Sequence, residues 1–320
     1  MATRNSRLVK IAAVQDAPVA FSLSESISKF ESLLHTATSS PHNADVVVFP
    51  EAFLCCYPRG YDFGAIIGSR TPEGRDWFRK YHDSAVDLSD LRPDSPWQRV
   101  LSSIRECNKA VVVLGVIEKE GQTGTIYCTA LTIGSDGNVL AKHRKLMPTA
   151  SERVVWGQGD GSGIQVAQTD FGKIGAVICW ENYMPLLRYS MYSMGVEIYC
   201  APTADGRETW ASTIRHIAAE GRCFVISVNQ FAKRSDYPAD YPPFLNTPAD
   251  EIVTGGGSMI AGPLGEILAG PLFNEAGILC VEVDLDDIQR AKLDFDPVGH
   301  YARPVSSDNA LAFGPCNQQI

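Results

Sequence analysis

Short apolar runs rich in valine and isoleucine recur along this chain, and several are separated by segments with helical periodicity. The first two runs, 8–14 and 45–49, predict strands, and apolar residues between them recur at helical spacing after Ser22 and Glu25. A serine followed three residues later by a glutamate is the pattern of a helix capping box. The opening therefore predicts strand, helix, strand, which is typical of an α/β protein.

The same reading extends through the rest of the chain. We predict helices from Thr71 and from Ser95, each followed by proline, and over 185–194 and 210–221. A long polar segment, 232–251, predicts a surface loop. Further strands are predicted at 110–116, 126–133, 138–141, 164–167, 173–178, 196–200, 223–228, 252–260, 266–269 and 277–283.

No internal repeat or low-complexity linker divides this series of elements. We therefore expect one domain over residues 1–305, with helices outside the strands, followed by a flexible tail over 306–320. That tail is rich in small and polar residues.

Composition excludes several classes of function. The 320 residues are 45% hydrophobic and 20% charged, and no apolar run reaches the roughly 18 residues that a membrane helix needs. The net charge of -9 disfavours nucleic acid and anionic membranes as partners, because both attract basic surfaces. No metal-binding motif or dinucleotide or nucleotide loop is present, so we expect no metal and no cofactor. Small molecules and other proteins remain as partners.

The nine cysteines do not form a disulfide pattern. Most lie inside apolar runs, where a free thiol packs as a small hydrophobic group. No apolar signal segment follows the basic start of the sequence, and no N-glycosylation acceptor occurs. We therefore expect a reducing, cytoplasmic setting.

Three chemically reactive side chains come directly after predicted strands: Glu51, Lys145 and Cys179. Taken one at a time, Cys179 could be a buried packing thiol, and Glu51 and Lys145 could be a structural ion pair. Taken together, they offer a nucleophile, a carboxylate and a cation. No histidine lies near Cys179 in the sequence, so a cysteine–histidine hydrolase is not indicated and a carboxylate base has to be considered.

Around these three residues the chain resembles the nitrilase superfamily. The motifs are FPEAF at Glu51, KHRKLMPTASE from Lys142 to Glu152, and ICWENYMP at Cys179. The segments GYDFG, EIYCAPTADGR, HIAAEGRCFVISVNQF and DFDPVGHYARP are similar to the nitrilase branch, and most of all to its plant-type members. The resemblance implies an αββα sandwich, in which helices lie outside two packed β-sheets.

The resemblance also implies roles for individual residues. Cys179 would be the nucleophile, Glu51 the general base and acid, and Lys145 the cation near the tetrahedral centre. Glu152 would be a second glutamate that orients Lys145. The backbone N–H of Trp180 would stabilise negative charge developing on the substrate.

Candidates for the substrate pocket are aromatic residues and one departure from the plant-type pattern. Relatives of that type carry two glycines where this chain has Cys55 and Cys56, so these thiols either narrow the pocket or fill a gap in the core. Tyr57, Trp156 and Trp210 are the aromatic candidates, although buried aromatic residues often belong to the core instead.

The resemblance implies hydrolysis of an organic nitrile to a carboxylic acid and ammonia, through a thioimidate and a thioester on cysteine, with some amide as a by-product. Two alternatives stay open: an amidase or carbamoyl hydrolase on the same scaffold, and a non-catalytic assembly protein. Family members form dimers and longer spirals, so a homodimer or larger homo-oligomer is expected. We place its interface on 185–194, where Leu187, Met191 and Met194 recur at helical spacing near Tyr189 and Tyr192. The alternative is that this face covers the protein's own sheet.

Overall fold

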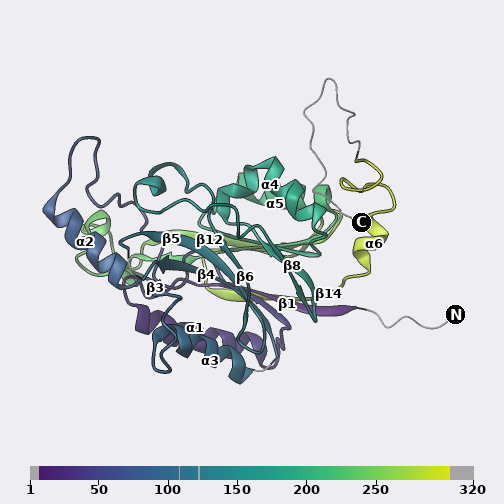
Figure 1. The fold of residues 1–320 in the computed structure, drawn as a ribbon, viewed down its shortest axis with the longest axis horizontal. Helices are drawn as coiled ribbons and strands as arrows, with labels where there is room; N and C mark the ends of the chain where they lie inside the picture. Colours follow the sequence, from purple (N-terminus) through teal and green to yellow (C-terminus); the bar gives the residue numbers. More distant parts are fainter. Residues whose placement is uncertain (1–6, 108, 122, 303–320) are drawn as a thin grey trace.

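The computed structural model describes residues 7–107, 109–121 and 123–302, and within them two seven-stranded sheets pack face to face (Figure 1). The first sheet has the order β14-β1-β2-β4-β5-β6, with β3 paired to β4. Its strands are β1 (Leu8–Gln15), β2 (Val46–Val48), β3 (Val86–Asp87), β4 (Val111–Lys119), β5 (Ile126–Ile133), β6 (Val139–Arg144) and β14 (Gly277–Asp284).

The second sheet has the order β11-β12-β10-β9-β8-β7, with β13 paired to β12. Its strands are β7 (Val166–Thr169), β8 (Gly172–Ala176), β9 (Ile198–Thr203), β10 (Phe224–Asn229), β11 (Phe231–Lys233), β12 (Ile252–Ala261) and β13 (Ile267–Phe273). The α-helices are α1 (Leu23–Thr38), α2 (Pro72–Asp83), α3 (Pro96–Cys107), α4 (Pro185–Ser193), α5 (Glu208–Gly221) and α6 (Asp287–Ala291). Among the residues that the structure describes, no helix is both long enough and apolar enough to cross a bilayer.

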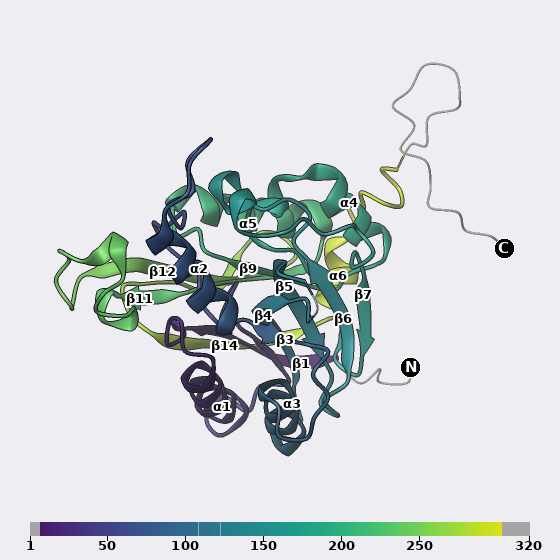
Figure 2. The same cartoon turned by 60° about the vertical axis from the view of Figure 1, so that its left-hand side comes forward.

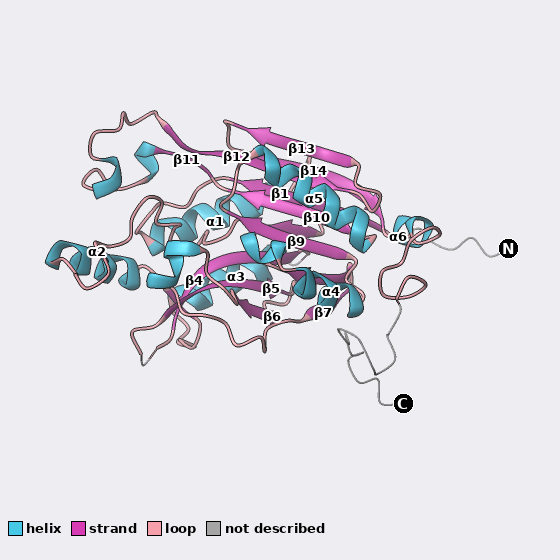
Figure 3. Cartoon of the chain, turned by 90° about the horizontal axis from the view of Figure 1, so that it is seen from above, coloured by secondary structure: helices cyan, strands magenta, loops and turns pink. Residues whose placement is uncertain are grey.

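Helices cover the outer face of each sheet, so the molecule has four layers. Figure 2 shows α1 and α3 side by side below the first sheet, and α4 and α5 lie on the far side of the second sheet. Figure 3, viewed from above, shows α4 and α5 lying across the strands of that sheet. The expected αββα sandwich is confirmed.

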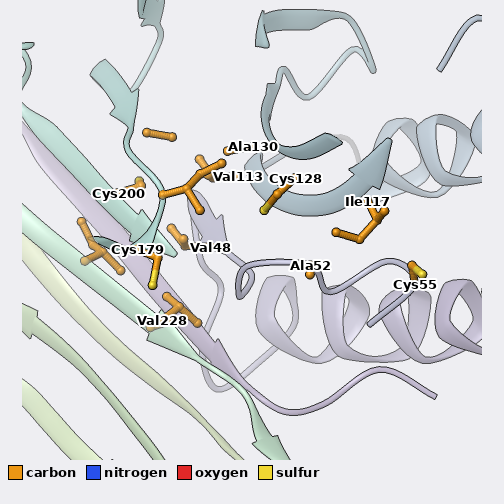
Figure 4. Close-up of a cluster of buried hydrophobic side chains, with 14 of the residues drawn as sticks. Val48, Ala52, Cys55, Val113, Ile117, Cys128, Ala130, Cys179, Cys200 and Val228 are labelled. Atoms are coloured by element: carbon orange, nitrogen blue, oxygen red, sulfur yellow. The ribbon is translucent and has the colours of Figure 1, made fainter. Parts of the chain in front are cut away.

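Alternation along buried strands separates the core into layers. In β2, Val46 and Val48 belong to the core between the two sheets, whereas Val47 packs under α1 and α3. Successive side chains of a strand point to opposite faces, so a continuous valine run fits a strand that is covered on both sides. Figure 4 shows the central core, where Val48 and Val113 of the first sheet lie near Cys200 and Val228 of the second.

The predicted strands all appear, but two local expectations were wrong, and a third, on helix α4, also needs correction. Helix α1 begins after Ser22 as expected, yet the Ser22 side chain makes no capping hydrogen bond, so no capping box forms. The segment 232–251 is not only a surface loop, because Tyr237 and Tyr241 stack with ring centroids 5.0 Å apart and are buried. The tail predicted over 306–320 lies outside the described residues.

The third correction concerns the helix predicted as a subunit interface, which is α4. Its residues Leu187, Met191 and Tyr192 are buried in the layer between α4, α5 and the second sheet. This face therefore covers the protein's own sheet, because an amphipathic helix turns its apolar side toward the nearest core. Leu186, on another side of the helix, is exposed.

A glycine in β4 brings the segment after β2 into close contact with the sheet. Gly115 O accepts a hydrogen bond from Leu54 N at 3.1 Å. A Cβ atom at Gly115 would overlap the carbonyl oxygen of Pro50 and lie 2.8 Å from Glu51 Cα. The absence of a side chain at Gly115 therefore sets where the backbone of Glu51 lies.

We predict that Gly115→Ala lowers both stability and activity. The methyl group has to displace the backbone at Pro50 and Glu51, and overpacking of this kind costs about 1–3 kcal/mol. Thermal unfolding should show a midpoint lower by several degrees, and activity per folded molecule should fall as well. The control is Gly124→Ala, where nothing lies within 4 Å of the added atom. Equal behaviour of the two variants would contradict this account of Gly115.

Candidate active site

The three reactive residues lie at strand ends that face each other across the two sheets. Glu51 follows β2 and Lys145 follows β6, both in the first sheet, whereas Cys179 follows β8 of the second sheet. All three are buried, with exposed fractions of 1%, 0% and 4%. A carboxylate, an ammonium and a thiol are thus enclosed together, in a place where charges interact more strongly than in water.

Lys145 is the centre of the charged group. Its Nζ donates to Glu51 Oε1 at 2.7 Å and to Glu152 Oε2 at 2.8 Å. Burial alone would lower the pKa of Lys145, but the negative charge of Glu51 and neighbouring groups outweighs it and holds that pKa well above its usual range. Lys145 therefore stays a cation.

Glu51 keeps one oxygen without a partner. Its Oε1 accepts from Lys145 and is also 3.5 Å from Cys128 Sγ, whereas Oε2 is buried and has no hydrogen-bond partner among the described residues. Burial raises the pKa of Glu51, and the charge of Lys145 limits this rise. A carboxylate with a raised pKa and a free oxygen is suited to take up and return a proton.

Glu152 is held from three sides. Its Oε1 accepts from the Tyr57 hydroxyl at 2.7 Å, and its Oε2 accepts from Thr149 N at 2.6 Å as well as from Lys145. Glu152 and Tyr57 together limit where the Lys145 ammonium group can lie.

Cys179 occupies a strained elbow between β8 and a short 3-10 helix, Cys179–Tyr183. Its φ of 49° is left-handed, which is uncommon for a residue with a side chain and is often found at functional sites. Asn182 Nδ2 holds this turn by donating to Val177 O at 2.9 Å and Cys179 O at 2.8 Å. The neighbouring Trp180 lines the hollow that opens onto Cys179.

The Cys179 thiol is not ionised at rest. Burial, followed by the negative charge of Glu51, raises its pKa to about 12, although Lys145 and Thr203 act in the opposite direction. Thr203 Oγ1 lies 3.2 Å from Cys179 Sγ. Because the thiolate is the nucleophilic form, this thiol needs a base to remove its proton.

A hollow of about 370 Å³ opens onto Cys179. Tyr57 and Glu152 form part of its wall, with Arg59 and Arg207 also lining it. A second hollow, of about 390 Å³, shares Tyr57 and Glu152 and is lined by Trp156 as well. The hydrogen-bonded pair Tyr57–Glu152 therefore lines both spaces. Among the described residues, no group of three or more His, Cys, Asp or Glu side chains is placed so that it could hold a metal ion.

Four of the five expected pocket residues do not line the hollow at Cys179, and of these four Trp156 lines the second hollow instead. Trp210 belongs to α5 and is buried between that helix and the second sheet, where its indole N–H donates to Ser227 Oγ at 2.8 Å. Cys55 and Cys56 are fully enclosed in the central core, and Cys55 Sγ is 3.0 Å from Ser84 Oγ. Of the two alternatives left open for these thiols, the structure favours filling the core, because the turn after Glu51 directs both of them into it.

Sequence reasoning also missed residues that contact the nucleophile or its loop. Thr203 ends strand β9, and Glu181 comes two residues after Cys179. Thr203 follows the same rule that singled out Glu51, since it is a polar residue at the end of a buried apolar run. Glu181 is part of the ICWENYMP motif, but nothing in the sequence shows which groups its side chain contacts.

We predict that replacing Cys55 and Cys56 together by glycine changes stability and leaves the order of preferred substrates unchanged. Cys55 has a φ of 102°, which glycine adopts without strain, but glycine also leaves a space in the core. Relative rates on a panel of small and bulky substrates should match those of the unmodified protein, measured beside thermal unfolding. A selective gain for bulky substrates would show that the thiols do border the pocket.

Comparison with known proteins agrees with this fold. A family model described as carbon-nitrogen hydrolase matches residues 10–293. A match over this much of the chain shows that the protein belongs to the carbon-nitrogen hydrolase family.

Among curated relatives, a bifunctional nitrilase/nitrile hydratase of Lupinus angustifolius is 49% identical, over 94% of this chain and 85% of its own length. An aliphatic nitrilase of Sinorhizobium fredii is 47% identical, over 92% of both. Among solved structures, a carbon-nitrogen hydrolase from Helicobacter pylori superposes with a TM-score of 0.69 at 21% identity, over 90% of this chain and 93% of its own. An amidase from Nesterenkonia superposes with a TM-score of 0.62 at 20% identity, over 89% and 94%. At such identities the two structures show the shared fold alone.

Proposed function

We propose that the protein hydrolyses an organic nitrile to the carboxylic acid and ammonia. The observation that carries this proposal is Lys145 held between Glu51 and Glu152 beside a protonated Cys179. The curated relatives named above, at 47% and 49% identity, support nitriles as the substrate class.

The first half of the reaction forms a covalent bond to sulfur. Glu51 Oε2 accepts the Cys179 proton as the sulfur adds to the nitrile carbon. The proton then passes to the nitrogen, so that C≡N becomes the C=N–H of a thioimidate. The Trp180 N–H and Lys145 stabilise the charge that develops on the substrate during this step.

The second half releases the product. Glu51 takes a proton from water as the water oxygen adds to the thioimidate carbon and passes it to the nitrogen, which gives a tetrahedral intermediate with one hydroxyl and one amino group. Glu51 then moves the hydroxyl proton to the amino group as the carbonyl forms, and the C–N bond breaks to release ammonia. The remaining thioester is hydrolysed by a second water, which gives the carboxylic acid and restores the Cys179 thiol. If the tetrahedral intermediate expels the sulfur before ammonia leaves, the product is the amide.

The other two functions considered from sequence have less support. The amidase named above is about 20% identical to this chain and shows the fold alone. Burying an ammonium group between two carboxylates costs desolvation free energy. A purely structural assembly protein has no need for such an arrangement. Nitrile hydrolysis is therefore the activity that we propose.

We also propose that the protein acts in the cytoplasm as a homodimer or larger homo-oligomer. Free cysteines throughout the described core fit a reducing compartment. Met184, Leu186 and Leu264 are exposed apolar side chains, of the kind that subunit interfaces cover. The interface would use these exposed residues and not the buried Leu187 and Met191.

The test of the proposed function is the pair of variants Cys179→Ala and Glu51→Gln. Each should reduce formation of acid and ammonia from a panel of nitriles by at least about 10³-fold, because one removes the nucleophile and the other its base. The matched control is Cys200→Ala, which removes a fully buried thiol of the same core. This control should keep its turnover and lose only stability. Turnover by Cys179→Ala within a few-fold of the unmodified enzyme would end the proposal.

A further inference from the structure

Glu181 is a buried carboxylate that the reaction above does not use. It lies in the 3-10 helix that begins at Cys179, and its side chain is 0% exposed. Burial of a carboxylate is costly unless several donors compensate for the lost water. The donors that surround Glu181 therefore indicate why the residue is there.

The two oxygens of Glu181 bind the backbone next to two different reactive residues. Oε1 accepts from Leu146 N at 2.6 Å, and Leu146 directly follows Lys145. Oε2 accepts from Ile178 N at 3.0 Å, and Ile178 directly precedes Cys179. One carboxylate thus joins the segment after β6 of the first sheet to the segment after β8 of the second.

His143 supplies a third donor from the end of β6. Its Nε2 lies 3.2 Å from Oε1 and 3.0 Å from Oε2 of Glu181. Its Nδ1 is buried and has no partner among the described residues. A hydrogen on Nδ1 would have no acceptor, so the geometry favours the tautomer in which Nε2–H donates to Glu181.

Three converging donors require an acceptor on both arms of the side chain. A carboxylate accepts at each oxygen, whereas the amide of glutamine places a donor on one arm, which would then face a backbone N–H. The Cys179 turn is already held from its own side by Asn182. The added effect of Glu181 is therefore the link to Leu146, across the gap between the sheets.

We propose that Glu181 is a positioning residue that fixes Lys145 relative to Cys179. Acting through the backbone of Leu146 and Ile178, it holds the cation and the nucleophile, which come from different sheets, at the separation that the chemistry needs. The inference rests on the proposed nitrile hydrolysis for its kinetic consequence, and on geometry for the link itself. Displacement of a reacting group by about 1 Å is enough to lower a rate by on the order of 10²-fold.

The experiment compares Glu181→Gln with the unmodified enzyme. We expect kcat to fall about 10- to 100-fold while KM stays within about threefold, because the substrate pocket is intact and only the reacting groups are misaligned. Alkylation of Cys179 by iodoacetamide, followed by peptide mass spectrometry, should slow several-fold. This second measurement does not depend on the identity of the substrate, so it tests the link even if nitriles are not hydrolysed.

The matched control is Glu118→Gln. Glu118 is also buried, but within the part of the chain that the structure describes its oxygens accept only from the side chains of Thr129, Lys142 and Arg144. This variant should lose stability while the folded enzyme keeps its kcat and its rate of Cys179 alkylation. It separates the general cost of altering a buried carboxylate from an effect on the site.

The proposal is overturned if the two variants lose the same fraction of kcat, or if Glu181→Gln raises KM and leaves kcat and alkylation unchanged. If Glu181→Gln does not fold, Glu181→Asp keeps the charge but is too short to reach both backbone donors. Its kcat and alkylation rate should fall in the same direction. Full retention of both rates by Glu181→Asp would equally contradict the proposed role.

Discussion

The site depends on one buried cation shared by two carboxylates. Lys145 holds Glu51 at 2.7 Å and Glu152 at 2.8 Å, and its side chain is completely enclosed. The cation limits the rise in the pKa of Glu51, so that this carboxylate can still act as a base in a place from which water is largely excluded. The Cys179 thiol, with a pKa raised to about 12, needs such a base. Removal of the Lys145 charge would therefore affect every later step.

The two-sheet sandwich provides the alignment that this arrangement requires. Glu51 and Lys145 come from the first sheet and Cys179 from the second, so their relative position depends on contacts between loops of different sheets. Gly115 lets the Glu51 segment lie close to β4. At the end of β6, Gly159 N donates to Lys145 O at 2.8 Å. Glu181 completes the set by binding both sheets through backbone N–H groups. Most of these contacts are made by backbone atoms and do not involve the reacting atoms themselves.

Sequence reasoning singled out Glu51, Lys145 and Cys179 because they share a simple position, a polar side chain directly after a buried strand, and the structure brings all three together. The same rule applies to Thr203, which was overlooked because a threonine is not unusual in a strand. Nearness in sequence could not decide between the two alternatives left open for Cys55 and Cys56. Cys55 and Cys56 follow Glu51 within five residues, yet the turn directs both thiols into the core. Helical spacing identified the apolar face of α4 correctly, but spacing alone does not say whether that face meets the protein's own sheet or a second subunit.

The most direct test of the central role of Lys145 is the pH dependence of stability in Lys145→Met. Without the cation, burial raises the pKa of Glu51 further, so the folded state retains a proton that the unfolded chain releases above its ordinary pKa of about 4.3. The free energy of unfolding of the variant, measured by chemical denaturation between about pH 5 and about pH 8, should fall relative to the unmodified protein as pH rises, by up to about 1.4 kcal/mol per pH unit for one proton. A difference between the two proteins that stays constant over this range would show that Lys145 does not balance the buried carboxylates, and would contradict the account.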